Sequence, residues 1–261
     1  MSTLIVIPAR LGSTRLPNKP LRTLGGLPLV VRVIERIRSL ALDAEAVVAT
    51  DAPEVADAVR AAGGTSVMTS DRHLSGTDRV AEVARRPEFA GHEIIVNVQG
   101  DEPFITADAF RAAVDTVARG LTPLGTAAVA DHPDILAMPS VVKVVRDTSG
   151  RALYFSRAPI PFLRDDSARR TRDALVLRHL GIYAYRPEAL QQWVSLPPAP
   201  LEVVEQLEQL RPVSAGIPIG VGICASAPGA GIDTEDDLRR ANAAWPSSPM
   251  IAPSPSPAGI H

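Results

Sequence analysis

The feature that most constrains the fold is an alternation of short apolar runs with amphipathic segments over the first 119 residues. Apolar runs with the length of a buried strand lie at residues 4–7, 46–49 and 94–98. Apolar side chains at helical spacing occupy residues 27–40, 53–62 and 104–119. Strands that alternate with helices predict an α/β fold with a doubly wound, mostly parallel sheet.

The pattern changes in the second half of the chain. Extended segments at residues 125–130, 141–146, 153–155 and 175–186 follow one another without a long helix between them. We then predict helices at 187–194 and 201–210, a strand at 217–224 and a closing helix from Thr234. These patterns predict a single domain over residues 1–245, in which halves of about 1–120 and about 121–245 share one sheet. Residues 246–261 are rich in proline and serine, so we predict a disordered tail.

Composition and charge exclude several classes of function. A net charge of −2 provides no general basic field for nucleic acid. No apolar run approaches the roughly 18 residues that a membrane span needs. The chain begins with a strand and shows no signal segment, so we expect a cytoplasmic protein without a membrane partner.

The cysteine and histidine content limits the possible metal sites. A single cysteine, Cys224, excludes an internal disulfide, and its apolar surroundings favour a core residue over a nucleophile. The five histidines form no His-Glu-x-x-His pattern, and there is no cysteine pair for zinc. A bound metal would therefore have oxygen ligands, which favours magnesium.

A basic loop follows the first predicted strand. We expect Pro8 to end this strand, because proline cannot donate a hydrogen bond to the sheet. Arg10, Arg15 and Lys19 come next, separated by small residues. An arginine fork can bind two phosphate oxygens and a lysine adds a compact charge. A basic loop at the carboxyl end of a strand therefore predicts a polyphosphate site, although its sequence is not that of a Walker A loop.

Two aspartates could complete such a site. Asp101 follows the apolar run at residues 94–98, beside Gly100, which would let a ligand approach the backbone closely. Asp233 starts the acidic stretch before the closing helix. Each carboxylate could instead cap a turn or a helix. The residues alone leave open whether either aspartate holds a metal ion.

Long motifs carry a resemblance to a known family. The run IPARLGSTRLPNKPL closely resembles the opening signature of the CMP-Kdo synthetases, the 3-deoxy-manno-octulosonate cytidylyltransferases. Further matches follow in the family's order: VATD, HLSGTDR, NVQGDEP, VVKVV, ALYFSRAPIPF, RHLGIYAYR, PLEVVEQLEQLR and GIDTEDDL. The resemblance extends over roughly residues 3–240, and motifs of this length are highly specific.

The resemblance implies a Rossmann-like, GT-A-type nucleotidyltransferase whose first half binds CTP. Asp101 and Asp233 match the two aspartates that hold Mg²⁺ against the triphosphate in that family. Arg15 and Lys19 would join them in catalysis by neutralising phosphate charge. The family's nucleotide-binding positions fall on Ala9, Arg10, Ser13, Arg15, Lys19, Ser75, Gly76 and Asp101.

The resemblance also implies that the second half binds an acidic acceptor and contributes to a homodimer near residues 150–186. Two arginines of this half can pair with a carboxylate, and its other polar side chains can bond to hydroxyls. From the residues alone, Glu208 could instead be a solvated helix residue and Tyr185 a core aromatic. The family's acceptor positions fall on Gln99, Arg157, Arg164, His179, Tyr185, Glu208 and Gln209.

The implied reaction is magnesium-dependent transfer of CMP from CTP to an acidic acceptor, Kdo, with release of pyrophosphate. Two segments depart from the family: Met-Pro-Ser at 138–140, where Asn-Pro-Asn is common, and residues 212–218. A CTP:phosphonate cytidylyltransferase, acting on phosphonoformate for example, therefore stays open. Two further alternatives are a non-catalytic nucleotide-binding protein on the same fold and a transferase that uses UTP or GTP.

Overall fold

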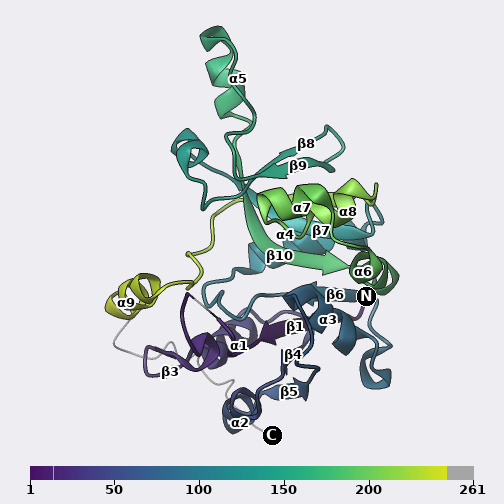
Figure 1. The fold of residues 1–261 in the computed structure, drawn as a ribbon, viewed down its shortest axis with the longest axis vertical. Helices are drawn as coiled ribbons and strands as arrows, with labels where there is room; N and C mark the ends of the chain where they lie inside the picture. The colour runs from purple at the N-terminus through teal and green to yellow at the C-terminus, as the bar shows by residue number, and fades with distance from the viewer. Residues whose placement is uncertain (14, 246–261) are drawn as a thin grey trace, which may run out of the picture.

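The structure is a computed structural model that describes residues 1–13 and 15–245. The segment predicted to be a disordered tail, residues 246–261, lies outside the described residues. Within them, a large sheet carries helices on both of its faces (Figure 1). The predicted α/β fold with a mostly parallel sheet is confirmed.

The first half of the chain supplies a parallel part of the sheet. The order of the main sheet is β11-β7-β10-β6-β1-β4-β5. Its parallel neighbours from the first half are β1 (Thr3–Ala9), β4 (Glu45–Thr50), β5 (Thr65–Met68) and β6 (Ile94–Asn97). Because parallel neighbours end at the same edge, the segments that follow β1 and β6 emerge side by side.

The second half extends the same sheet through an antiparallel strand. β10 (Leu177–Tyr185) pairs antiparallel with β6 on one side and with β7 (Leu124–Ala130) on the other. β11 (Ile219–Cys224) then pairs parallel with β7. Strands from the two halves of the chain thus share one sheet, joined at β10.

Pro8 lies inside β1, so the expectation that it ends the strand was wrong. β1 pairs with β4 as far as Ala9, but its pairing with β6 stops at Val6. The Val6 carbonyl accepts a hydrogen bond from Val98, which lies just past β6. Pro8, two residues later, faces the same side beyond the end of β6. Its missing N–H therefore removes no hydrogen bond from the sheet.

Two apolar cores lie on the opposite faces of the sheet. One core includes side chains from α1 (Leu29–Ser39), α2 (Pro53–Ala61) and α4 (Ala107–Ala118). The other includes side chains from α3 (Gly76–Ala84), α6 (Pro187–Ser195) and α8 (Leu210–Ser214). Among the described residues, no helix is both long and apolar enough to cross a membrane.

A helix predicted at residues 201–210 is divided in the structure. α7 (Pro200–Glu205) ends where Gln206 adopts a left-handed conformation with φ of 52°. A left-handed residue cannot continue a right-handed helix, and α8 begins only at Leu210. The apolar spacing gave no signal of this break, because left-handed residues are usually glycine or asparagine.

An antiparallel pair branches from the main sheet. β8 (Lys143–Arg146) pairs with β9 (Ala152–Ser156) and joins β10 where Lys143 lies opposite Arg178. After β9 the chain projects away from the body to α5 (Arg169–Asp173) (Figure 1). No residue of α5 is buried, so it lacks the apolar pattern by which a helix is predicted. Short 3-10 turns occupy Lys19–Leu21, Pro87–Phe89, Pro133–Ala137 and Asp166–Ala168.

Candidate active site

A cavity of about 330 Å³ opens where β1 and β6 end and α3 begins. The basic loop after β1 forms one side of it, and the turn after β6 forms another. All of the nucleotide-binding positions implied by the sequence line this cavity: Ala9, Arg10, Ser13, Arg15, Lys19, Ser75, Gly76 and Asp101. Positions that are up to 92 residues apart (9 to 101) are therefore brought together by the edge of the sheet.

Gly100 has a different role from the one that its sequence position suggested. A Cβ atom at this position would lie 2.8 Å from the carbonyl oxygen of Pro8. Real Cβ atoms do not approach a backbone oxygen so closely. Gly100 thus lets the end of β1 approach the turn after β6, and this contact brings the basic loop close to Asp101.

Lys19 bridges the two aspartates that were predicted to bind metal. Its ammonium donates to Asp101 Oδ2 at 2.7 Å and to Asp233 Oδ1 at 2.8 Å. Arg15 Nη2 donates to the same Asp233 oxygen at 3.1 Å. Burial works to lower the pKa of Lys19, but the two carboxylates outweigh it, so the pKa is raised. Lys19 is therefore charged at neutral pH.

A small apolar cluster brings Asp233 to this place. It joins the hairpin of β2 (Thr23–Leu24) and β3 (Leu27–Pro28) to α9 (Glu235–Ala243). The Ile232 N–H donates to the Asp101 carbonyl at 2.9 Å, and Arg22 pairs with Glu235 at 2.7 Å. The cluster consists of Leu16, Leu24, Leu29, Ile232 and Leu238.

Neither aspartate caps the helix that follows it. Thr106 caps α4, and Thr234 caps α9 in a reciprocal capping box with Asp237. The carboxylates of Asp101 and Asp233 instead converge on one cationic group, the Lys19 ammonium. Two hard oxygen donors at one point fit a magnesium ion. Magnesium usually completes its shell with substrate phosphates and water.

The start of α3 is linked to the second half of the chain. Ser75 caps α3 in a capping box with Asp78. The Thr77 hydroxyl donates to Glu208 Oε2 at 3.0 Å, and the Ser75 hydroxyl lies 3.0 Å from Glu208 Oε1. Burial raises the pKa of Glu208, although these two hydrogen bonds oppose the rise. Glu208 is therefore not a solvated helix residue; it holds the helix that lines the nucleotide side.

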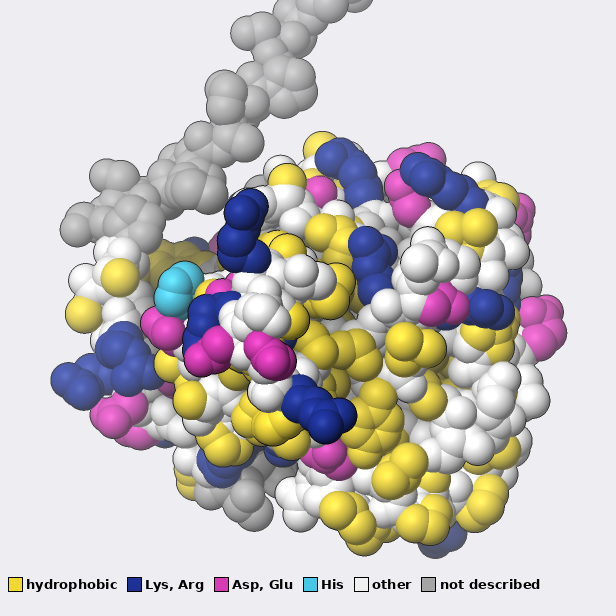
Figure 2. Space-filling view, turned by 90° about the horizontal axis from the view of Figure 1, so that it is seen from above, with side chains coloured by type: hydrophobic (Ala, Val, Ile, Leu, Met, Phe, Trp, Pro, Cys, Tyr) yellow, Lys and Arg dark blue, Asp and Glu magenta, His cyan; other side chains and the backbone are white. Residues whose placement is uncertain are grey.

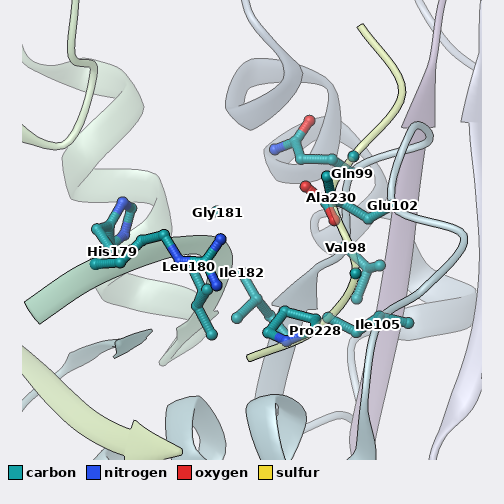
Figure 3. Close-up of a pocket in the computed structure, with 13 residues that line it drawn as sticks. Val98, Gln99, Glu102, Ile105, His179, Leu180, Gly181, Ile182, Pro228 and Ala230 are labelled. Carbon is teal, nitrogen blue, oxygen red and sulfur yellow. The ribbon is translucent and has the colours of Figure 1, made fainter. Parts of the chain in front are cut away.

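A second cavity, of about 130 Å³, adjoins the first at Gln99, which lines both. Gln99 and Glu102 lie on one side of it, and Leu180 and Ile182 of β10 lie on the other (Figure 3). Burial raises the pKa of Glu102 to about 8, and the charges of Asp101 and Asp233 add to the rise. Sequence reasoning missed Glu102, whose only signal was its place directly after Asp101.

His179 also lines the second cavity, although its ring points away from the side chains of Gln99 and Glu102 (Figure 3). Its Nε2 lies 2.9 Å from the Thr126 hydroxyl oxygen. The Phe155 ring packs edge-on against the imidazole, with 5.0 Å between the two ring centroids. Burial lowers the pKa of His179 to about 3. The imidazole is therefore neutral near pH 7.

The other acceptor candidates line neither cavity. Tyr185 is fully buried against Trp193, the position that the core-aromatic alternative describes, and its acceptor role stays a prediction. Gln209 is also buried. Arg164 is exposed before the α5 projection, and Arg157 bonds to protein carbonyl groups. The acceptor roles of Gln209, Arg164 and Arg157 stay predictions.

Comparison with known proteins identifies the family. A family model described as Cytidylyltransferase matches residues 4–219. A curated relative, the 3-deoxy-manno-octulosonate cytidylyltransferase of Gemmatimonas aurantiaca, is 58% identical over 245 residues, which are 94% of this chain and 95% of the relative. The chain belongs to this cytidylyltransferase family. It is therefore an enzyme of the nucleotidyltransferase class.

Solved structures place the cytidylyltransferase fold in a wider group. A CMP:2-keto-3-deoxy-manno-octonic acid synthetase complexed with CTP matches with a TM-score of 0.84 and 42% identity, over 93% of this chain and 98% of that one. A putative glucose-1-phosphate thymidylyltransferase from Bacillus anthracis matches with a TM-score of 0.61 and 15% identity, over 92% and 94% of the two chains. The second likeness concerns the fold alone.

Proposed function

We propose that this cytidylyltransferase transfers CMP from CTP to Kdo, which yields CMP-Kdo and pyrophosphate. One observation carries the proposal: Arg15, Lys19 and Asp101 line a single cavity, and Asp233 joins them through its contacts with Arg15 and Lys19. Cations suit a triphosphate and paired carboxylates suit a divalent ion. The name of the relative with 58% identity supports Kdo as the acceptor.

The side chains of the cavity would act by binding and by neutralising charge. Arg10, Arg15 and Lys19 would bind phosphate oxygens and hold the triphosphate in place. The C2 hydroxyl oxygen of Kdo would then form a bond to the α-phosphorus and lose its proton to water, and the bond from this phosphorus to the pyrophosphate oxygen would break. The same cations would stabilise the negative charge that builds up on the leaving pyrophosphate.

We propose Mg²⁺ as the cofactor, held by Asp101 and Asp233. The ion would add positive charge beside the phosphates of CTP. Because Lys19 bridges the two carboxylates, its ammonium would turn to the triphosphate when the ion binds. This change of partner would leave no carboxylate uncompensated and would place Lys19 where the reaction needs a cation.

The decisive experiment measures pyrophosphate release with CTP and Mg²⁺ for Kdo, a sialic acid, phosphonoformate and a blank without acceptor. Turnover with Kdo and not with the other acceptors is the expected result. Turnover with phosphonoformate alone would replace Kdo with a phosphonate and keep the cytidylyl transfer. Replacement of CTP by UTP or GTP should abolish the Kdo reaction, and equal rates would contradict the choice of base.

We also propose that the enzyme is a cytoplasmic homodimer. Figure 2 views the molecule from the α5 end, and hydrophobic side chains gather over a broad area of this face. A patch of this kind typically marks an interaction site. Light scattering should give twice the chain mass, and a Val204→Glu variant should give the single chain mass. Exposed apolar residues of this end include Leu153, Phe162, Leu175, Val203 and Val204.

A further inference from the structure

Lys143, at the start of β8, is a fully buried charged residue. Its ammonium donates to the carbonyl oxygens of Val141 at 2.8 Å and Met138 at 3.1 Å, and also to that of Arg157. Three carbonyls satisfy its three N–H groups, which a buried ammonium requires. Burial lowers the pKa of Lys143 and the nearby Arg157 lowers it further, while Glu205 opposes both. Lys143, Arg157 and Glu205 thus form one compact group of charges.

Arg157 is held at four points, three of them by Lys143 or Glu205. Its N–H donates to Glu205 Oε2 at 2.9 Å, and its carbonyl accepts from Lys143. Its Nε donates to the Glu205 carbonyl at 3.0 Å, and its Nη1 donates to the Pro139 carbonyl at 3.1 Å. The Ser156 hydroxyl, at 2.6 Å from Glu205 Oε1, fixes the carboxylate in turn. An arginine normally loses much rotamer freedom when it binds a ligand, but here that freedom is already restricted.

We propose that Lys143 and Glu205 are positioning residues: their side chains fix the main chain of Arg157 and so place its guanidinium for the carboxylate of the acceptor. This inference rests on the proposed function and on the acceptor role that the family resemblance implies for Arg157. In the part of the chain that the structure describes, Nη2 of Arg157 makes no hydrogen bond, whereas Nε and Nη1 both do. Nη2 is therefore the part of the fork that is free to donate to an acceptor.

The same group fixes the segment in which this chain departs from its relatives. The carbonyls of Met138, Pro139 and Val141 all accept hydrogen bonds from Lys143 or Arg157. These contacts use the main chain of the segment and none of its side chains. Met138 and Ser140 can therefore differ from the common Asn-Pro-Asn motif while Arg157 keeps its place.

The test is a double-mutant cycle on Glu205 and Arg157, with KM for Kdo, KM for CTP, kcat and the melting temperature measured for each variant. Glu205→Ala should raise KM for Kdo about 10-fold and leave KM for CTP within about 2-fold. Glu205→Gln keeps a side-chain oxygen that can accept from the main-chain N–H of Arg157, so it should restore most of the loss. In the Arg157→Ala background, Glu205→Ala should have no further effect on KM for Kdo, because a positioning residue acts through its target.

Glu202→Ala is the matched control. Glu202 lies on the same helix, α7, and pairs with Arg211 at 2.5 Å. Its loss should lower the melting temperature and leave KM for Kdo unchanged. Lys143→Met should repeat the Glu205→Ala pattern, and if it does not fold, the Glu205 cycle still decides.

Two outcomes would overturn the inference. One is a rise in KM for Kdo in Arg157→Ala that Glu205→Ala fails to reproduce, and the other is an equal rise in Glu202→Ala. Neither outcome touches the proposed function, which fails separately if the wild-type enzyme does not turn over Kdo.

Discussion

The nucleotide side and the acceptor side of this enzyme differ in how completely their residues come together. On the nucleotide side, every implied binding residue lines one cavity, and two aspartates meet at one lysine. On the acceptor side, Gln99 and His179 line the second cavity, while Tyr185 is in the core and Arg164 is exposed. The implied nucleotide residues are thus brought together at one cavity, whereas only part of the implied acceptor set lines the second cavity.

The difference follows from the topology of the sheet. The basic loop and the Asp101 turn follow β1 and β6, which are parallel neighbours, so the edge of the sheet brings them together. The acceptor residues come from the turn after β6, the segment after β9, the antiparallel β10 and the connection between α7 and α8. No single edge collects those elements. The sheet topology therefore positions the proposed phosphate-binding residues, whereas the positions of the proposed acceptor residues depend on individual side-chain contacts.

The largest expected effect is a loss of activity when either aspartate of the nucleotide side is replaced. Asp101→Asn and Asp233→Asn should each lower kcat by about 100-fold or more, because each variant removes a charged ligand of the proposed ion. Melting temperatures should stay close to that of the wild type, because both carboxylates are partly exposed. Steady-state kinetics at several Mg²⁺ concentrations measures the effect.

Asp236→Asn provides the control for this pair. Asp236 lies on α9, close to Asp233 in sequence, but it pairs with the exposed Arg239 at 3.1 Å. Its replacement should leave kcat unchanged. Full activity of either Asp101→Asn or Asp233→Asn at ordinary Mg²⁺ would remove the basis for the metal site.

A smaller effect is expected on the acceptor side, where His179 should make the stability of the protein depend on pH. The pKa of His179 is about 3 in the folded protein, compared with about 6.5 in the unfolded chain. Below about pH 6.5 the unfolded chain therefore binds a proton that the folded protein does not bind, and stability falls. Between about pH 7 and pH 5 this histidine should cost about 2 kcal/mol of unfolding free energy.

Urea unfolding of the wild type and of His179→Gln at the two pH values measures this cost. The wild type should lose about 2 kcal/mol more unfolding free energy between pH 7 and pH 5 than His179→Gln does. His132→Gln, at an exposed histidine, serves as the control for the loss of a histidine. An identical pH dependence in the wild type and His179→Gln would mean that the imidazole is more accessible than the structure indicates.

The smallest effect concerns the link between the two sides. Ser75→Ala removes a helix cap and a contact with Glu208, so it should cost about 1 kcal/mol of stability and raise KM for CTP a few-fold. Thr106→Ala removes only a cap, that of α4, and should cost similar stability without a change in KM. Equal KM values in the two variants would show that Ser75 only caps its helix.

Much of the fold was predictable because buried strands and amphipathic helices leave periodic signals. The helix after Pro53 ends near Gly63 as expected, and the strand before Asp101 lies where its apolar run predicted. The errors concern features without such a signal. Pro8 continues β1 because a neighbouring strand ends early, and Gln206 divides a helix through its backbone conformation.

The candidate site was predictable in its members more than in its contacts. Sequence motifs pointed to Lys19, Asp101 and Asp233, but nothing in the sequence indicated that one ammonium bridges both carboxylates. Glu102 and Glu205 were missed because their significance depends on burial and on hydrogen bonds between distant segments. Such partnerships arise from tertiary packing, which local patterns do not record.

The docking of α9 has a consequence for the synthesis of the enzyme. The basic loop is translated first, and Asp101 soon follows, but the second carboxylate at Lys19 comes from Asp233. A nascent chain that has grown only to residue 230 could form most of the sheet and still lack half of the acidic pair. The docking of α9, the last helix that the structure describes, would therefore determine when a chain gains both proposed metal ligands, and a product that ends before it would contain the basic loop without Asp233.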